Sequence, residues 1–357
     1  MKAENTDQIR LTQYSHGAGC GCKLSPKILE KILGDNLALP DNERLLVGNH
    51  SKDDAAVYDL GDGMALISTT DFFMPIVDDP FDFGRIASAN ALSDVYAMGG
   101  RPILAIAILG WPVDQLPAEL AGRVIAGSRS ICKEAGIPLA GGHSIDSTEP
   151  IFGLAVNGLA PIGHIKQNNT AKNGDILFLT KKLGTGILTT AEKKGLLQEP
   201  HRGLAAVQMM QLNRLGEQLG GIKGVHAMTD VTGFGLLGHT LEMAEGSGLS
   251  AALYFRQLPL IAADLKTYIE EKCVPGGTFR NWESYGDRIS LDGELDAAYA
   301  KAILADPQTS GGLLIAASPD SKEEIREILE ANQLVSLPIG KLVPQQEKII
   351  YVQNQPG

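Results

Sequence analysis

The 357-residue chain is poor in cysteine, has no long apolar run and carries no excess of basic charge. Its four cysteines are too few for a disulfide framework in a chain of this length, and they suit a reducing compartment. No apolar stretch approaches the length of a membrane span, and the polar first residues do not resemble a signal peptide. We therefore expect a cytoplasmic protein with no membrane partner.

The charge balance is acidic, with 31 Lys and Arg against 42 Asp and Glu, which gives a net charge of −11. Such a balance argues against nucleic acid or an anionic membrane as the main partner. An acidic enzyme can still bind a polyphosphate if its carboxylates hold magnesium ions that reverse the local sign of charge.

Familiar phosphate-binding signatures are also missing. The sequence has neither a Gly-x-x-x-x-Gly-Lys-Ser/Thr loop nor the glycine-loop signature of protein kinases, and it shows no short-period repeat or low-complexity tract. The composition is instead that of a glycine-rich globular protein, with 44% hydrophobic residues, 20% charged residues and 41 glycines. At this length two domains are expected.

The first half of the chain alternates expected strands with expected helices. Residues 25–33 read as an amphipathic helix, with Ser25 as N-cap and Pro26 at its first position. The strands are expected at 53–58, 65–71, 103–109, 138–140 and 151–160, and the further helices at 83–98 and 116–135. This pattern predicts an α/β or α+β unit that ends near residue 165.

The second half of the chain also alternates expected strands with expected helices. Expected strands are 174–180, 225–230 and 313–317, and expected helices are 187–194, 204–219 and one that begins near 236. An apolar strand ending in Thr-Asp occurs in both halves, at 70–71 and 229–230, which indicates weakly that the halves are built alike.

A glycine-rich loop near the start of the chain, residues 16–23, carries two cysteines and a lysine. Glycines let a backbone lie close to a ligand and leave short side chains exposed. Lys23 directly follows Cys22, and a lysine can raise the reactive thiolate fraction of a nearby thiol. Two other interpretations stay open: a tail with incidental cysteines, and a Cys-x-Cys metal clip, which is weakened because Cys132 and Cys273 are isolated. The loop favours a reactive thiol on a mobile segment that approaches phosphate.

Aspartates gather at expected strand ends or on the helix that follows one. Magnesium prefers hard oxygen ligands and is commonly shared between carboxylates and substrate phosphates. Asn90 and Asp94 are four residues apart on one helix, so both can point into one site. Each aspartate taken singly is equally consistent with capping a helix or a turn. The set is Asp53, Asp54, Asp71, Asp94 and Asp230.

Two glycine motifs are ambiguous. Residues 141–144 (Gly-Gly-His-Ser) read as a backbone approach to an anion or as a tight turn with a solvated histidine. Residues 306–312 (Asp-Pro-Gln-Thr-Ser-Gly-Gly) read as a phosphate nest or as a simple turn.

Together these motifs closely resemble the selenophosphate synthetases (selenide, water dikinases), and the resemblance covers nearly the whole chain. The strand-end aspartates and the Thr-Gly-Phe-Gly run are shared more widely, among the aminoimidazole ribonucleotide synthetase-like ATP enzymes. The Cys-Gly-Cys-Lys loop separates the synthetases from those relatives, and many members carry selenocysteine where this chain has Cys20. The matching runs are 19–23, 53–57, 70–73, 140–144, 229–235 and 306–312.

The resemblance implies a two-domain α/β (α+β) fold of the aminoimidazole ribonucleotide synthetase-like type. It implies a mobile catalytic loop and helix over 1–48, an ATP- and magnesium-binding dimerisation domain over 49–165, and a C-terminal α/β domain over 170–357. In this family the N-terminal sheet pairs with that of a second subunit, so that a homodimer shares a β-barrel and each ATP site uses both chains.

The resemblance also implies the reaction: ATP, selenide and water give selenophosphate, AMP and orthophosphate, with more than one Mg²⁺. A selenium-delivery protein is a further partner to consider, and nucleic acid and membrane are not. Carried over by position, Cys20 and Lys23 are the catalytic residues, and Asp54, Asp94 and Asp230 are the metal ligands. The ATP contacts are Lys23, Ser51, Lys52, Asp53, Asp71 and Asp94, with Gly142, His143 and Ser144 reaching ATP from the partner subunit.

Two competing functions stay in view. One is another ATP-dependent enzyme of the superfamily, such as a ribonucleotide cyclo-ligase or a thiamine-phosphate kinase, against which the Cys-Gly-Cys-Lys loop argues. The other is a non-catalytic thiol or metal carrier on the same fold, against which the complete set of matched carboxylates and Lys23 argues.

Overall fold

The first half of the chain folds around a six-stranded mixed sheet. The computed structural model describes residues 9–22, 31–32, 42–48 and 53–356. All neighbours in this sheet are antiparallel except β4 and β5, which run parallel. In spatial order its strands are β1 (Leu45–Val47), β2 (Ala56–Asp59), β3 (Met64–Phe73), β6 (Ile151–Pro161), β4 (Arg101–Trp111) and β5 (Leu139–Asp146).

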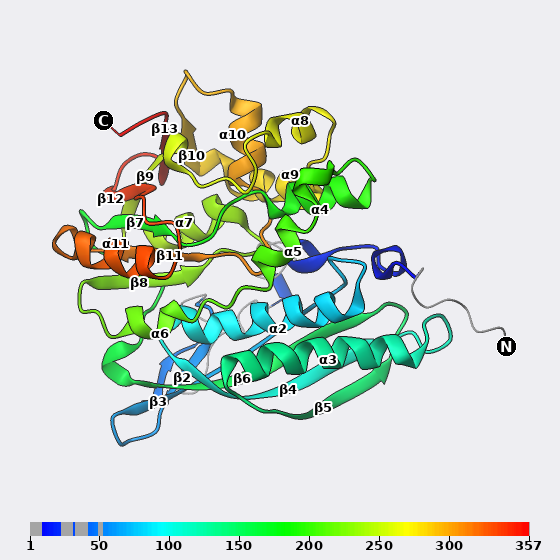
Figure 1. The fold of residues 1–357 in the computed structure, drawn as a ribbon. Coiled ribbons are helices and arrows are strands. Elements are labelled where there is room, and N and C mark those ends of the chain that lie inside the picture. Colours follow the sequence, from blue (N-terminus) through cyan, green and yellow to red (C-terminus); the bar gives the residue numbers. More distant parts are fainter. Residues whose placement is uncertain (1–8, 23–30, 33–41, 49–52, 357) are drawn as a thin grey trace.

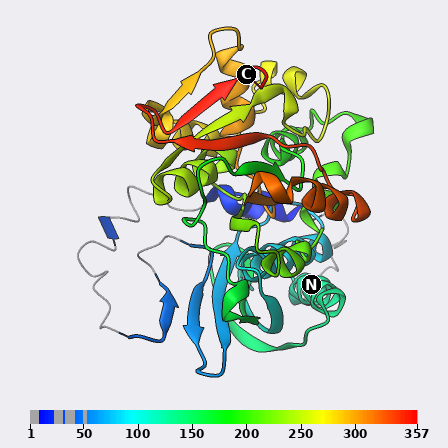
Figure 2. The same cartoon turned by 90° about the vertical axis from the view of Figure 1, so that its left-hand side faces the viewer.

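Two long helices, α2 (Pro80–Ala97) and α3 (Ala118–Ala135), cover one face of this sheet (Figure 1). Asp79 caps α2 by accepting a hydrogen bond from the Asp82 backbone N–H at 2.9 Å. The helices cross through glycines: a Cβ on Gly84 would lie 1.9 Å from the Val124 carbonyl oxygen, and one on Gly127 would lie 2.0 Å from that of Phe81. No described helix covers the other face of the sheet (Figure 2).

The second half of the chain forms a seven-stranded mixed sheet. In spatial order its strands are β10 (Ile289–Leu291), β13 (Ile350–Gln353), β9 (Leu249–Tyr254), β12 (Gly340–Pro344), β7 (Ile176–Leu179), β11 (Leu313–Ala317) and β8 (Val225–Asp230). The pairs β10–β13 and β13–β9 are parallel. Its helices are α4 (Thr185–Lys193), α5 (Leu204–Met209), α6 (Leu215–Gly220), α7 (Gly235–Gly246), α8 (Leu265–Glu270), α9 (Gly276–Tyr285), α10 (Ala297–Leu304) and α11 (Lys322–Ala331).

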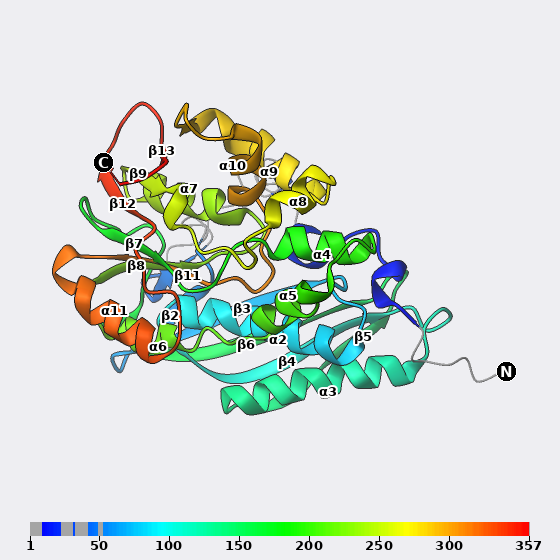
Figure 3. The same cartoon turned by 45° about the horizontal axis from the view of Figure 1, so that its top comes forward.

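Helix α2 lies between the two halves, above the first sheet and below α5 and α6 (Figures 1 and 3). Fifteen of its 18 residues are buried, because partners cover it on nearly every side. The main hydrophobic core accordingly runs without a break from strands of the first sheet to strands of the second. None of the helices in the described part of the chain is long and apolar enough to cross a membrane.

The expected two-domain α/β fold is confirmed, and three expected elements need correction. The helix expected over 204–219 is two helices, α5 and α6, because Asn213 between them turns inward and donates to Ser93 Oγ at 2.7 Å and to Gly311 O at 2.8 Å. The strand expected at 65–71 continues to Phe73, so Asp71 lies within β3 and not at its end. The strand expected at 138–140 continues to Asp146. The helix expected over 25–33 lies outside the described residues except for 31–32.

Candidate functional site

Four carboxylates from three separate parts of the chain meet where the two halves join. Asp53 and Asp54 precede β2, Asp94 lies on the last turn of α2, and Asp230 ends β8. Asp94 and Asp230 are buried, with 8% and 2% of their surface exposed. The charges of Asp230, Asp53 and Asp94 all act on Asp54, so the aspartates expected to share a site do lie near one another.

Threonine hydroxyls hold these carboxylates in place. Thr229 Oγ1 donates to Asp54 Oδ1 at 3.0 Å, which ties the end of β8 to the segment before β2. Thr69 Oγ1 on β3 donates to Asp94 Oδ2 at 2.6 Å. Asp53 accepts hydrogen bonds from the backbone N–H groups of Asp54 at 3.1 Å and Asn168 at 3.3 Å. Asp53 and Asp54 are therefore held by residues that follow the first sheet, whereas Asp94 is held by a strand of its own half.

Burial and mutual repulsion favour the protonated form of the carboxyl groups in this cluster. Burial first, and then the charges of Asp230, Asp53 and Asp94, raise the pKa of Asp54 well above its ordinary value. Burial likewise raises the pKa of Asp53 to about 7, against the lowering effect of its two backbone hydrogen bonds. Clustered carboxylates of this kind fit a divalent cation, which would remove the repulsion.

Oδ2 of Asp54 is buried and accepts no hydrogen bond from the described residues, as expected of an oxygen available to a cation. The described residues contain no group of three or more His, Cys, Asp and Glu side chains already arranged as metal ligands. The donor set thus has the chemistry for Mg²⁺, although its side chains are not arranged as a finished ligand set.

Asp71 and the thiol are joined to this region through Asn90 on α2. Asn90 Nδ2 donates to Asp71 Oδ2 at 2.7 Å. Its Oδ1 accepts from the backbone N–H of Ser310 at 2.8 Å and from Cys20 Sγ at 3.2 Å. One amide side chain thus connects the thiol, a strand carboxylate and the 306–312 segment.

Cys20 itself is buried, with 1% of its surface exposed, and this corrects the expectation of an exposed thiol. It lies in a short 3-10 turn, Gly19–Cys22, whose backbone is held on two sides. The Cys20 N–H donates to Thr309 Oγ1 at 3.1 Å, and Arg280 donates to Gly21 O at 2.9 Å. Gly19 has φ of 51°, and a Cβ there would lie 2.3 Å from Thr309 Oγ1. Glycine therefore lets the turn reach the second half of the chain.

The 306–312 segment is a buried scaffold and not a solvent-exposed turn. Asp306 Oδ2 accepts from the backbone N–H of Gly186 at 3.0 Å, and burial raises the pKa of Asp306 to about 8. Gln308 Oε1 accepts from Thr185 Oγ1 at 2.6 Å. These contacts fix the segment against the start of α4, and Thr309 and Ser310 then face Cys20 and Asn90.

The sequence reasoning missed Lys181. This lysine follows β7 and is buried, and its Nζ donates to Gln211 O at 2.7 Å and Ser310 O at 2.8 Å. Burial lowers its pKa to about 7, although the nearby Asp230 charge works in the opposite direction. A lysine directly after an apolar strand was the available signal, but its two carbonyl partners come from distant segments.

The Gly142-His143-Ser144 run lies in β5, an exposed edge strand, and not in a loop. Within the sheet, β4 and β6 separate it from β3, which carries Asp71. A single chain therefore does not bring these residues to the carboxylates. Lys23, Ser51 and Lys52 lie outside the described residues.

Comparison with known protein families assigns the class. The model of the AIR synthase related protein N-terminal domain matches residues 52–160, and that of the corresponding C-terminal domain matches residues 172–353. A thiamine-monophosphate kinase from Stenotrophomonas maltophilia has the same fold, with a TM-score of 0.63 at 19% identity, over 93% of this chain and 96% of that one. The hydrogenase maturation protein HypE in complex with ATP superposes with a TM-score of 0.60 at 19% identity, over 95% and 90% of the two chains. The fold and the two matches define a two-domain protein of the AIR synthase related class.

Closer relatives narrow this class. The selenide, water dikinase of Aeromonas hydrophila is 60% identical over 334 residues, which cover 94% of this chain and 95% of the relative. That of Photorhabdus laumondii is 57% identical over 346 residues, which cover 97% and 98%. The chain belongs to the selenide, water dikinase family.

Proposed function

We propose that this chain is a selenide, water dikinase that converts ATP, selenide and water into selenophosphate, AMP and orthophosphate. The observation that carries the proposal is the joining of the thiol-bearing turn to the carboxylate region through Asn90. This arrangement brings a soft chalcogen-handling group next to a site with the chemistry for a metal-bound polyphosphate. Relatives named selenide, water dikinase over nearly the full length support the same reaction.

Asp54, Asp94 and Asp230 are the proposed ligands of Mg²⁺. The mutual repulsion that raises the pKa of Asp54, and the oxygen of Asp54 that accepts no described hydrogen bond, support this assignment. Bound there, the metal would neutralise charge on the phosphates of ATP. A polyphosphate that loses two phosphoryl groups suits more than one such ion.

Asp53, Asp71, Ser51 and Lys52 are the proposed ATP contacts of the same chain, with Asp94 bridging to the metal. Asn90 orients Asp71 by donating to its Oδ2 at 2.7 Å. Phosphoryl transfer depends on positioning and charge neutralisation more than on covalent chemistry by the protein. Fixed carboxylates and amides fit that demand.

Cys20 and Lys23 are the proposed catalytic residues. The buried position of Cys20 keeps bulk water from the sulfur, which favours transfer of the first phosphoryl group to selenide over its loss to water. The Lys23 side chain would contribute a positive charge to the transferring γ-phosphoryl group.

The proposed assembly is a homodimer that shares a β-barrel. Large apolar side chains on the first sheet, Phe72, Ile106 and Ile145, are 49%, 42% and 59% exposed, and no described helix covers that face. The edge strand β5 is exposed along nearly its whole length. Exposed apolar patches and unpaired strand edges of this kind are typical of association surfaces. Gly142, His143 and Ser144 on β5 would then contact the ATP of the partner subunit.

Product analysis tests the reaction. The protein is incubated with Mg²⁺, ATP and selenide, and the phosphorus products are resolved by ³¹P NMR. Selenophosphate and AMP in equal amounts are expected, and neither should form without selenide. If ADP is the final nucleotide, or if the products are the same with and without selenide, the proposal is contradicted and another ATP enzyme of the class is favoured.

The metal ligands are tested separately by calorimetric titration of Mg-ATP. Replacement of Asp54, Asp94 or Asp230 by Ala should each weaken binding by about tenfold or more, because the uncompensated polyphosphate meets the remaining carboxylates. Asp287→Ala on an exposed turn is the control. Unchanged binding in all three variants contradicts the shared metal site.

A further inference from the structure

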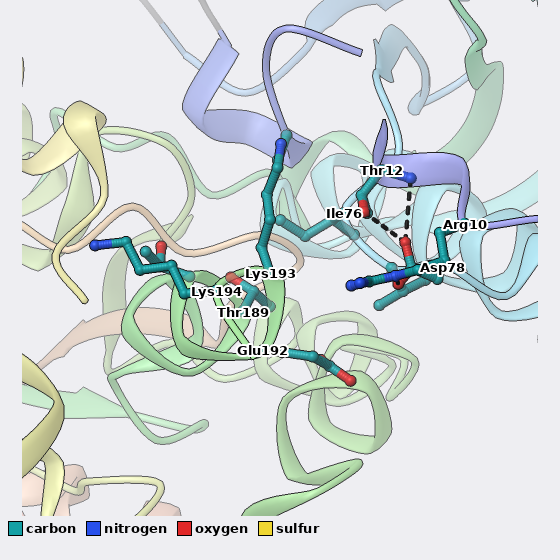
Figure 4. Close-up of a pocket in the computed structure, with 11 residues that line it drawn as sticks. Arg10, Thr12, Ile76, Asp78, Thr189, Glu192, Lys193 and Lys194 are labelled. Atoms are coloured by element: carbon teal, nitrogen blue, oxygen red, sulfur yellow. Dashed lines mark hydrogen bonds and ion pairs between the residues drawn. The ribbon is translucent and has the colours of Figure 1, made fainter. Parts of the chain in front are cut away.

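A cavity of about 290 Å³ opens between the N-terminal segment and α4, and it is not part of the carboxylate cluster. Arg10, Thr12 and Asp78 lie on one side, and Thr189 and Lys193 of α4 lie on the other, with Ile76 between them (Figure 4). Asp78 is held by Arg10 Nε at 2.6 Å and by the Thr12 backbone N–H at 3.2 Å. These two hydrogen bonds fix the position of Asp78 in the cavity wall.

This cavity continues inward toward the thiol. A smaller cavity of about 60 Å³ shares four of its wall residues with the first: Ala18, Ile76, Thr189 and Thr190. The inner cavity is also lined by Gly21 and Thr309. Thr309 Oγ1 accepts the N–H of Cys20 at 3.1 Å, so the inner cavity ends at the turn that carries the thiol. Its volume is several times the roughly 10–15 Å³ that one water needs, so it has room for a small anion or a reagent of a few atoms.

The two sides of the thiol differ in charge. On one side Asn90 connects Cys20 to Asp71, and beyond it lie Asp54, Asp94 and Asp230. On the other side the outer cavity is lined by three cationic residues, Arg10, Lys193 and Lys194, against two acidic ones, Asp78 and Glu192. Arg10 pairs with Asp78 at 2.6 Å, which leaves Lys193 and Lys194 against the single carboxylate of Glu192. An anion that approaches Cys20 through the cavity therefore meets less negative charge than one that approaches past the aspartates.

We propose that these two cavities form the entry route of selenide, a small anion at neutral pH, to the buried Cys20. The inference rests on the proposed function. It separates the paths of the two substrates: the nucleotide approaches the carboxylates with its metal, and selenide arrives from the opposite side of the Gly19–Cys22 turn. Such a separation spares an anionic nucleophile from crossing a field of four aspartates. It also suits a displacement in which the attacking atom approaches the γ-phosphorus from the side away from the leaving oxygen.

The first test changes charge at the mouth of the route. Lys193 is exposed at the mouth and makes no ion pair among the described residues, so Lys193→Glu should leave the fold intact. We expect the KM for selenide to rise about tenfold, while the KM for ATP and the kcat at saturating selenide stay near the wild-type values. Lys223→Glu, in the exposed turn that follows α6, is the matched control and should change neither KM, since Lys223 lines neither cavity.

The second test narrows the route without altering charge. Thr190 lines both cavities, and within the described part of the chain its hydroxyl donates to Gly186 O, one turn earlier in the same helix. Thr190→Leu should therefore fold and should also raise the KM for selenide selectively. An unchanged selenide KM in both variants, or an equal rise in the KM for selenide and for ATP, overturns the route. Neither result affects the proposed function, which depends on selenophosphate formation by the wild-type protein.

A readout independent of turnover uses alkylation of Cys20 in a Cys22→Ser background, followed by peptide mass spectrometry. The rate ratio of anionic iodoacetate to neutral iodoacetamide reports the charge along the path to the sulfur. The ratio should fall several-fold when Lys193→Glu is added. A ratio that Lys193→Glu leaves unchanged means that reagents reach Cys20 by another path, which overturns the proposal.

Discussion

Cys20 and Cys22 are separated by one glycine, but the contacts described above belong to Cys20. Its Sγ lies 3.2 Å from Asn90 Oδ1, and its backbone N–H is held by Thr309. Serine has nearly the same shape and can donate the same hydrogen bond, so a Cys20→Ser protein should keep the turn in place while losing the chalcogen.

We therefore predict that Cys20→Ser lowers selenophosphate formation by at least about 100-fold without lowering Tm, as expected when a group at the reacting centre is removed. Cys22→Ser should change kcat/KM for selenide only slightly. Selenium-dependent AMP release and thermal unfolding are the measurements. Equal inactivity of the two variants would show that the loop acts through some property other than the Cys20 thiol.

The carboxylate cluster lowers the stability of the metal-free protein. The pKa of Asp53 is raised to about 7 and that of Asp54 is raised well above 3.8, so the native state holds protons that the unfolded state has already lost. Their favourable contribution is complete below pH 4 and is lost as the pH rises through the native-state values.

We predict that Asp54→Asn raises the stability of the metal-free protein by about 1 kcal/mol at pH 8, because it removes one of the repelling charges, and that it abolishes activity. The gain should vanish at about pH 3, where the wild-type carboxyl is protonated in both states. Melting curves at the two pH values in EDTA provide the measurement. A variant less stable than the wild type at pH 8 would contradict the destabilising role of this cluster.

At the level of elements, periodicity predicted the central helices and the strands that carry the aspartates. The sequence could not show that α2 is covered on nearly every side, because a helix with buried Ser88, Asn90 and Ser93 resembles a polar-faced one. Contacts between distant segments also explain the remaining differences between the predicted and the observed structure. Asn213 interrupts the predicted helix because it donates hydrogen bonds to Ser93 of α2 and to Gly311. Lys181 is buried because it donates to a backbone carbonyl of a distant segment, which the hydrophobic pattern of the sequence does not reveal.

The sequence supplied candidate residues for the site but not their geometry. The resemblance supplied Cys20, Asp54, Asp94 and Asp230, whereas their hydrogen-bonding partners Thr69, Thr229 and Thr309 came only from the fold. A threonine gives no distinctive signal in a sequence, since the same hydroxyl suits a surface, a turn or a strand.

The position of the Gly19–Cys22 turn depends on Gly233 in the segment between β8 and α7. A Cβ on Gly233 would lie 2.6 Å from the Cys20 carbonyl oxygen, so alanine there must displace the turn. We predict that Gly233→Ala lowers kcat by about tenfold or more through misplacement of the thiol, with little change in the KM for ATP. Gly293→Ala is the matched control because a Cβ there meets nothing within 4 Å. Full activity of Gly233→Ala would show that the thiol tolerates displacement.

At the scale of the whole molecule, the proposed dimer makes each site depend on two chains. Two-fold symmetry gives two equal sites, each with Cys20 of one subunit and His143 of the other. A His143→Ala chain paired with a Cys20→Ser chain would place both defects in one site and leave the other site intact.

We predict that mixing these two inactive variants restores about one quarter of the wild-type activity, since half of randomly assorted dimers are mixed and each has one intact site. Subunit exchange is verified by native mass spectrometry of chains with different tags. If exchange is complete and no activity returns, the sites are not shared in this way.

The burial of α2 on nearly every side has a consequence for how the gene can be divided. This helix packs on the first sheet and on α5 and α6, and the unbroken core passes through it. A chain cut after residue 165 would leave one side of α2 bare in the first fragment, and the second fragment would lose the surface on which α5 and α6 rest. Although the chain has two sheets and two family matches, we expect that neither half folds when it is separated from the other. Changes that lengthen, shorten or recombine the protein are therefore expected to be tolerated at its outer loops and not at the junction between the halves.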